Sequence, residues 1–244
     1  MMGRMDELVS DRTFGINREP PLLETLLSKL ALFHQVERSQ LGSIALLSSA
    51  KRVRRGAVIC RHGERLTGVI ALGYGIMKVA LRHRDGEEKV IRFMGANETF
   101  GECAVLLNLP SPVDVVALED SVVAEIPSAP LMRLLERDLR FSNNFSRAVA
   151  GRFLNLLAEH GASLQQNAQQ RIAAYLMSLV AENVARGIWI ARLPASKTAV
   201  AARLGMTKET FSRQLRDLTE RALIAVVGRE IEVRDLSAVV ELSR

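Results

Sequence analysis

The spacing of apolar residues changes at Pro127, and this change limits the chain to a β part followed by a helical part. From about residue 51 to 127, short β-branched runs are separated by glycines, as in the segment MKVALRHRDGEEKVIRF. In that segment the turn dipeptide Asp85–Gly86 is flanked by alternating apolar residues, a pattern typical of a β-hairpin. Several such strands in succession predict a β-barrel or jelly roll, and a generic β-sandwich fits the same pattern equally well.

Helical periodicity replaces this pattern after Pro127. Apolar residues recur on one stripe over 131–164, and no proline interrupts 138–163, so we expect one long helix there. The narrow apolar stripe of a long helix is either buried in the core or paired with another helix. The positions beside the stripe are polar, which favours pairing between two copies of the chain. The predicted dimer-interface residues are Phe145, Val149, Phe153 and Leu156.

Composition limits the classes of protein to which this chain can belong. The chain has 244 residues with 48% hydrophobic content and a net charge of +6, which favours polyanionic partners. Its two cysteines, Cys60 and Cys103, exclude a disulfide scaffold and a four-thiolate zinc or iron–sulfur site within one chain. No apolar run reaches the roughly 18 residues of a membrane span, and the N-terminus lacks the apolar core of a signal peptide. We therefore expect a soluble protein of the reducing cytoplasm, without a membrane partner.

The segment from Ser196 to Arg234 carries the strongest functional signal. Ser196 is placed to cap a helix that runs to about Arg203 and ends at Gly205. Thr207 is placed to cap the next helix, which begins at Lys208. Two short helices joined by a turn that contains glycine predict a helix-turn-helix.

The second of these helices separates apolar from polar residues. Phe211, Leu215 and Leu218 form one stripe, and a second stripe contains Glu209, Ser212, Arg213 and Arg216. Arginine can bond guanine O6 and N7, glutamate can accept from a base amino group, and serine can meet thymine or a phosphate. An ordinary solvated helix face has the same appearance, so this stripe alone leaves both interpretations open.

The residues after this helix favour the DNA-binding interpretation. Leu223 to Val233 is predicted to form a β-hairpin, or wing, with Gly228 and Arg229 at its tip, where Arg229 could reach a phosphate. Residues 166–244 contain 12 Lys/Arg against 8 Asp/Glu, so they carry most of the excess positive charge. The predicted DNA-binding residues are Ser196, Thr207, Lys208, Glu209, Ser212, Arg213, Arg216 and Arg229.

These motifs resemble a known family. The segment TKETFSRQLRDL, with AARLGM before it and GREIEVRD after it, resembles the winged helix of the Crp/Fnr regulators, the catabolite-activator and fumarate-nitrate proteins. Upstream, RRGAVICRHGE, GYGIMKV, DGEEKVIRF, TFGECAVL and VVALEDSVVAEI resemble their cyclic-nucleotide-binding-type barrel. The resemblance implies an α+β fold with an N-terminal β jelly roll, a long dimerisation helix and a C-terminal winged helix-turn-helix.

The same resemblance implies a domain division and a mode of action. The expected parts are a mobile N-terminus (1–20), a sensor barrel with flanking helices (21–137), a dimerisation helix (138–165) and a DNA-binding domain (166–244). A homodimer would bind a two-fold symmetric operator with half-sites about one helical turn apart. An effector would shift the hinge between the long helix and residues 166–175 and so reorient the recognition helices. RNA polymerase is an expected further partner.

The recognition helix resembles the fumarate-nitrate branch. Glu209, Ser212 and Arg213 match its Glu-x-x-Ser-Arg arrangement, which implies half-sites of the TTGAT kind with Arg213 on the guanine. The catabolite branch has glycine in place of Ser212 and arginine in place of Lys208. Lys208 could contact a phosphate or remain solvated, and the sequence favours neither.

The effector is not cyclic AMP if the resemblance is followed residue by residue. Cyclic-AMP sites of this family hold the phosphate with an arginine, but this chain has Ser111 at that position, and a phosphate pocket without its guanidinium loses its strongest contact. Leu156 and Leu157 replace the hydroxyl pair that meets adenine. The predicted effector-pocket residues are Gly101, Glu102, Cys103, Ser111, Phe153, Leu156 and Leu157.

The family also contains members with an iron–sulfur cluster and members with haem, and the sequence bears differently on each. Residues 1–59 lack the cysteine group of the oxygen-labile iron–sulfur branch, and Cys60 and Cys103 are expected to be small buried apolar residues. Some relatives without those cysteines sense nitric oxide or carbon monoxide through haem. The candidate haem ligands are His34, His62, His83 and His160. Their spacing is not diagnostic, and His160 and His62 are preferred. A different small molecule, or no ligand, is an equally good interpretation.

Two positions depart from the family pattern. Asn97 stands in a turn where asparagine tolerates a positive φ, so the turn should persist. Ala222 stands where relatives end the recognition helix with glycine, so local repacking is expected there. No catalytic constellation is found, which predicts that the protein is not an enzyme. The alternative function is a ligand-binding or interaction module whose winged helix contacts protein.

Overall fold

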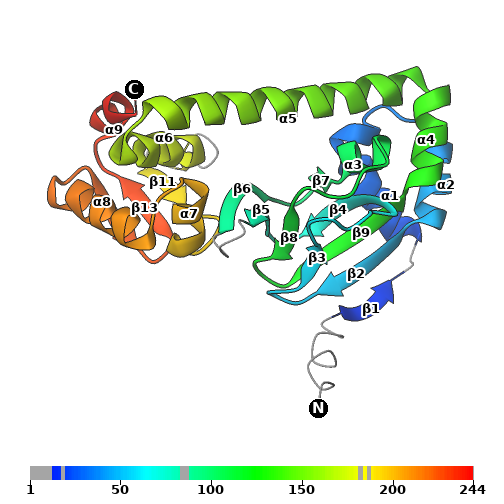
Figure 1. Ribbon diagram of the computed structural model, residues 1–244, viewed down its shortest axis with the longest axis horizontal. Coiled ribbons are helices and arrows are strands. Elements are labelled where there is room, and N and C mark those ends of the chain that lie inside the picture. The colour runs from blue at the N-terminus through cyan, green and yellow to red at the C-terminus, as the bar shows by residue number, and fades with distance from the viewer. Residues whose placement is uncertain (1–12, 18–19, 83–87, 181–183, 186–187, 244) are drawn as a thin grey trace, which may run out of the picture. The chain divides into compact units, whose positions relative to one another are not determined.

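The computed structural model describes residues 13–17, 20–82, 88–180, 184–185 and 188–243. These residues form two compact units, one comprising 1–82 with 93–152 and the other 83–92 with 153–244 (Figure 1). The predicted α+β class is confirmed, because a β domain, a long helix and a helix-turn-helix with a small sheet follow one another along the chain. Among the described helices, none is long and apolar enough to cross a membrane.

Two antiparallel sheets build the β domain. One has the order β1 (Thr13–Asn17), β2 (Ser49–Val53), β9 (Ser121–Pro127), β4 (Gly68–Tyr74), β7 (Thr99–Phe100). The other has the order β3 (Val58–Cys60), β8 (Asp114–Ala117), β5 (Met77–Arg82), β6 (Glu88–Met94). A buried cluster with members from both sheets, including Leu72, Met77, Val115 and Val123, forms the core between them. The expected Asp85–Gly86 turn lies outside the described residues.

Helices cover the other face of the five-stranded sheet. They are α1 (Pro20–Lys29), a 3-10 turn (Ala31–Phe33), α2 (Arg38–Leu47) and α4 (Ser128–Arg137). Along β9, Ala124 and Ile126 join the core under these helices, whereas Val123 joins the core between the sheets. This period-two alternation is the expected consequence of strand geometry, and it fixes which β9 side chains face the barrel interior.

The N-terminal region is more ordered than the sequence predicts. Thr13–Asn17, expected within an irregular mobile segment, forms β1 and pairs antiparallel with β2. The pairing continues an existing sheet edge and satisfies backbone groups that would otherwise need water, which a composition-based interpretation cannot detect. The rest of residues 1–20, apart from Pro20, lies outside the described residues.

The predicted long helix is α5 (Leu139–Gln165). The Asp138 carboxylate caps its start by accepting hydrogen bonds from the backbone of Arg140 (2.9 Å) and Phe141 (3.0 Å). Phe141 packs against Phe33 with ring centroids 5.2 Å apart, and Phe145 follows at 6.2 Å from Phe141.

Two of the predicted interface residues lie in this intramolecular core. Phe145 is only 4% exposed, and Val149 is partly buried against the same cluster. The prediction of an apolar stripe did not separate the part of the helix that is buried within the chain from the part that is exposed. Phe145 and Val149 are therefore occupied by contacts within the chain.

The second unit contains the helix-turn-helix. Its elements after α5 are α6 (Ala168–Val180), β10 (Val184–Ala185), β11 (Ile188–Arg192), α7 (Lys197–Arg203), α8 (Lys208–Glu220), β12 (Ile224–Val227), β13 (Glu230–Val233) and α9 (Leu236–Leu242). The strands form one antiparallel sheet in the order β10, β11, β13, β12. The β12–β13 hairpin is the predicted wing.

Candidate DNA-binding surface and effector domain

Hydroxyl caps fix the start of both helices of the helix-turn-helix. Ser196 Oγ accepts from the backbone N–H of Ala199 at 3.3 Å, and Thr207 Oγ1 accepts from that of Thr210 at 3.2 Å. Between the helices, Gly205 has φ 64°, a left-handed conformation that glycine adopts at little cost. The caps and the glycine turn together place α8 after α7 as the sequence predicts.

The faces of α8 separate as expected. Phe211 and Leu218 are 0% exposed and Leu215 is 3% exposed, so this stripe is clamped to the body of the unit. Lys208, Glu209, Arg213 and Arg216 are exposed, and Ser212 is half-buried. None of these five side chains forms a hydrogen bond or ion pair with a described residue. Their donors and acceptors are therefore free to meet an external partner.

The end of α8 keeps the left-handed geometry despite its alanine. Ala222 has φ 57°, and the N–H of Leu223 donates to the carbonyl of Leu218 at 3.0 Å. The N–H of Ala222 donates to Thr219 at 2.9 Å, which completes a Schellman-type end. The expected repacking does not occur, because these bonds and the buried Leu223 hold the chain in place.

The wing exposes Arg229 at its tip. Gly228 has φ 61°, and Val227 pairs with Glu230 across the hairpin, so Arg229 lies within the turn. Its side chain is exposed and contacts no described residue through a hydrogen bond or ion pair, while its carbonyl accepts from Leu193 at 2.8 Å. The backbone of the tip is thus fixed and the guanidinium is free.

An ion pair that the sequence did not reveal joins α5 to α7 within the second unit. Arg203 Nη2 lies 2.6 Å from Glu159 Oε2, and Arg203 is 17% exposed. At the α5–α6 junction, Asn167 accepts from the N–H groups of Gln169 (2.9 Å) and Gln170 (3.0 Å). The C-terminal part of α5 is therefore connected directly to the first helix of the helix-turn-helix.

In the first unit, Glu102 meets a guanidinium from α5. Gly101 has φ 95° and precedes α3 (Glu102–Leu106), in which Glu102 is almost fully buried. Arg152 Nη1 lies 2.6 Å from Glu102 Oε1, a close contact of opposite charges without aligned hydrogen-bond geometry. Arg152 Nη2 also donates to Thr99 Oγ1 at 2.8 Å. The sequence does not predict this role for Arg152, because the residue occupies an ordinary polar position on a helix.

Ser111 is committed to a local turn. It is 1% exposed, and its hydroxyl donates to the carbonyl of Val113 at 2.9 Å. Its backbone N–H donates to Glu64 and its carbonyl accepts from Gly63, both at 2.7 Å. The hydroxyl at the position of the family's phosphate-binding arginine therefore shapes the loop.

The seven predicted effector-pocket residues are divided between the two units. Gly101, Glu102, Cys103 and Ser111 belong to the first unit, whereas Phe153, Leu156 and Leu157 belong to the second. On α5, Phe153 is 59% exposed, Leu156 49% and Leu157 51%, with Leu154 beside them at 63%. These four exposed apolar side chains of α5, Phe153, Leu154, Leu156 and Leu157, are called the α5 apolar patch below.

The two cysteines differ in exposure. Cys60 is buried as expected, but Cys103 is exposed, because it lies on the outer side of the short helix α3. Burial raises the pKa of Cys60; a hydrogen bond with Ser111 lowers it, and the charges of Glu64 and Asp114 raise it further. Partial burial raises the pKa of Cys103, the Glu102 charge raises it further and Arg152 lowers it. Raised pKa values make both thiols poor nucleophiles at neutral pH.

The candidate haem ligands do not converge among the described side chains. His34 and His62 are exposed, and the backbone N–H of His62 donates to Asp114 Oδ1 at 2.7 Å. His83 and the side chain of His160 lie outside the described residues. The described part of the chain contains no group of three or more His, Cys, Asp or Glu residues that could hold a metal ion.

Comparisons with known proteins decide the family. A model of the cyclic nucleotide-binding domain matches residues 50–138, and a model of the Crp-like helix-turn-helix domain matches residues 170–242. The chain belongs to the Crp/Fnr family of transcription regulators. Regulators of this family are DNA-binding proteins with an effector domain and are not enzymes, as the sequence predicted.

Individual Crp/Fnr relatives match along most of the chain. The anaerobic regulatory protein of Pasteurella multocida is 28% identical over 212 residues, covering 86% of this chain and 77% of the relative. The fumarate and nitrate reduction regulatory protein of Yersinia pestis is 26% identical over 209 residues, covering 85% and 82%. Among solved structures, FixK2 from Bradyrhizobium japonicum shares the fold, with a TM-score of 0.73, 20% identity, and coverage of 81% of this chain and 98% of that chain.

Proposed function

We propose that this regulator is a homodimer that reads a palindromic TTGAT-like operator through α8 and is switched by an effector in or near the barrel. The observation that carries the proposal is the free polar face of α8. Glu209 and Arg213 are exposed and bond to no described residue, while the opposite face of the helix is buried. A helix held by one face and free on the other can enter a major groove without unfolding any part of the protein.

The side chains on that face suit the proposed half-site. Arg213 would donate two hydrogen bonds to guanine, and Glu209 would accept from the amino group of cytosine or adenine. Arg216, Lys208 and the wing Arg229 would contact phosphates, while Ser196 and Thr207 would present the helix starts to the backbone. The two curated relatives reported above are an anaerobic regulator and a fumarate and nitrate regulator, which supports the same branch.

The α5 apolar patch supports a homodimer. Several large apolar side chains on successive turns of one helix lose contact with water when a second copy of the helix covers them. Phe153 and Leu156 are the predicted seam residues that the patch retains. In this proposal the regulator works in the cytoplasm with its DNA, and RNA polymerase is a further partner.

The effector in this proposal is neither cyclic AMP nor a four-iron cluster. The Ser111 hydroxyl is already bonded to Val113, Glu102 is already paired with Arg152, and Leu156 and Leu157 offer no hydroxyls. Two cysteines in the whole chain cannot supply four thiolates. Haem, held through His160 or His62, stays a hypothesis, and an absorption spectrum of protein prepared with added haem tests it.

The proposal is tested by fluorescence anisotropy with a palindromic TTGAT duplex and a matched duplex with scrambled half-sites. We expect binding to the palindrome to exceed binding to the scrambled duplex. It should also weaken by orders of magnitude between low and physiological salt, because several phosphate contacts release counterions. Equal binding to both duplexes, or binding that does not change with salt, would favour a module that contacts protein.

A further inference from the structure

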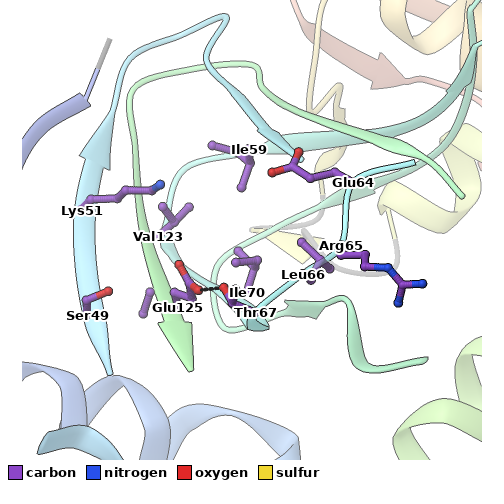
Figure 2. A pocket seen from close by; sticks show the side chains of 11 residues that line it. Ser49, Lys51, Ile59, Glu64, Arg65, Leu66, Thr67, Ile70, Val123 and Glu125 are labelled. Carbon is purple, nitrogen blue, oxygen red and sulfur yellow. Dashed lines mark hydrogen bonds between the residues drawn. The ribbon is translucent and has the colours of Figure 1, made fainter. Parts of the chain in front are cut away.

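A cavity lies in the first unit, and neither Glu102 nor Ser111 lines it. It has a volume of about 260 Å³ and is lined by β2, β3, β4, β9 and the loop between β3 and β4 (Figure 2). Because β3 belongs to one sheet and the other three strands to the other, the cavity opens between the two sheets. None of the predicted effector-pocket residues lines it.

Charged side chains occupy inward-facing positions of two strands here. Val123 is 2% exposed in the core between the sheets, and Glu125, two residues further along β9, faces the same side. On β2, Lys51 lies two residues before Val53, a member of the same core, and therefore faces the same side. Both side chains are only half-buried, so their charged ends reach the open side of the cavity while their stems lie against the core.

Neither charge is fully engaged by the described residues. Thr67 donates a hydrogen bond to Glu125, which leaves the carboxylate with further acceptor capacity. The Lys51 ammonium forms no hydrogen bond or ion pair with a described residue, and it extends toward the cavity in Figure 2. Lys51 and Glu125 are not paired with one another, so each can meet a separate group of a ligand.

The other charged side chains at the rim are already engaged. Glu64 Oε2 accepts from the backbone N–H of Arg61 at 2.8 Å. Arg65 Nη1 donates to the carbonyl of Asn108 at 2.7 Å, and its guanidinium is directed away from the cavity in Figure 2. Glu64 keeps a second carboxylate oxygen, but that carboxylate is tied to the loop between β3 and β4, so Lys51 and Glu125 are the charged side chains that the strands themselves present to the cavity.

Apart from Ser49 and Thr67, the rest of the lining is apolar. Ile59, Leu66, Ile70 and Val123 line the cavity, and Ile70 is only 7% exposed. Cavities that bind small molecules combine such apolar walls with a few convergent polar groups. At about 260 Å³ the space lies just below the roughly 300–1,000 Å³ of most ligand pockets, so it suits a small ligand.

We propose that this cavity binds a small zwitterion with an apolar body, in particular an α-amino acid with an aliphatic side chain. Its carboxylate would meet Lys51, its ammonium would meet Glu125, and its side chain would lie against Ile59, Ile70 and Val123. A simple anion would leave the Glu125 carboxylate uncompensated, and a simple cation would leave Lys51 uncompensated. A ligand that carries both charges pairs with both groups at once.

The test is isothermal titration of the full-length protein with leucine, 4-methylpentanoate and 3-methylbutylamine. The last two share leucine's branched body but each lacks one of its charges. We expect leucine to bind and each analogue to bind about tenfold more weakly or worse, because a charge-assisted hydrogen bond is lost. This comparison uses only the wild-type protein, so it does not depend on the folding of any variant. It needs no DNA, so its outcome is independent of the proposed operator binding.

Variants assign the binding to the cavity. Lys51→Gln and Glu125→Gln should each weaken leucine binding about tenfold or more, and each should leave unchanged the weak binding of the analogue that lacks the corresponding charge. Arg52→Gln, at the exposed neighbouring position on β2, is the matched control and should bind leucine like wild type. The proposal is overturned if leucine shows no binding up to millimolar concentration, if both analogues bind as well as leucine, or if Arg52→Gln is as harmful as Lys51→Gln.

Discussion

Arg203 of α7 and Glu159 of α5 form an ion pair, with 2.6 Å between Nη2 and Oε2. Because Arg203 is only 17% exposed, the pair is screened less than an ordinary surface pair. It ties the first helix of the helix-turn-helix to the long helix at a point before the α5–α6 junction. In the proposed mechanism an effector acts through this junction, so the pair limits how far the hinge between α5 and residues 166–175 can turn.

Arg203→Gln should loosen that connection. We expect a loss of about 0.5–1 kcal/mol in the free energy of unfolding, since one partner is half-exposed. We also expect a weaker preference for the optimal half-site spacing, measured by anisotropy on operators lengthened or shortened by one base pair. Arg221→Gln, which removes a surface pair with Asp217 at 3.6 Å, is the control and should keep the preference. If Arg203→Gln lowers affinity equally at every spacing, the pair does not restrict the hinge.

Arg213→Ala tests the recognition helix. The loss of a bidentate contact to guanine should cost about 1–3 kcal/mol of specific binding and relax the preference at that base pair. The measurement is competition anisotropy with single-base variants of the half-site. Arg229→Ala, at the wing tip, should instead weaken binding to all sequences alike and reduce the salt slope by about one. Equal losses on specific and scrambled DNA for Arg213→Ala would reduce this residue to a phosphate contact.

Phe153→Glu tests the α5 apolar patch. A carboxylate in a closely packed seam would lose its hydration without gaining a partner, so the dimer should dissociate and operator binding should be lost. Sedimentation equilibrium gives the mass directly. Leu139→Glu changes a residue that is 75% exposed at the other end of the same helix, and it should leave the mass unchanged. If the mass of Phe153→Glu is unchanged, this part of α5 does not form the dimer interface.

Local patterns predicted the elements of this protein, and tertiary contacts decided which side chains are free. The caps Ser196 and Thr207, the turn at Gly205 and the two faces of α8 depend on short-range geometry, so the sequence was sufficient to find them. Phe145 and Phe153 lie on one periodic stripe, yet one is in a core and the other is exposed, because the neighbouring helices that bury Phe145 are far from it in sequence. Arg152 and Arg203 acquire their roles from partners on other elements, which no spacing rule reports.

Glu102→Gln should make Cys103 more reactive. Partial burial and the adjacent Glu102 charge raise the pKa of Cys103, so little thiolate is present at pH 8 and alkylation by iodoacetamide should be slow. Removing the carboxylate charge also leaves Arg152 unneutralised, and both changes lower the pKa of the thiol. Alkylation at pH 8, followed by mass spectrometry, should therefore be several-fold faster, with the pH midpoint shifted downward. The buried Cys60 serves as an internal reference, and Glu136→Gln on α4 should change nothing. A midpoint that does not move would show that burial alone determines this pKa.

Ala222→Gly should stabilise the protein at the end of the recognition helix. Ala222 has φ 57°, where a Cβ crowds the following carbonyl at a cost of about 1 kcal/mol that glycine avoids. The gain is partly offset by the greater entropy of glycine in the unfolded chain, so we expect a net increase of about 0.5–1 kcal/mol in the free energy of unfolding. Urea titration followed by circular dichroism measures it. Ala202→Gly, inside α7 with helical geometry, is the matched control and should destabilise by about 1 kcal/mol. Destabilisation by both substitutions would mean that the methyl group of Ala222 contributes more through its contacts than it costs in backbone strain.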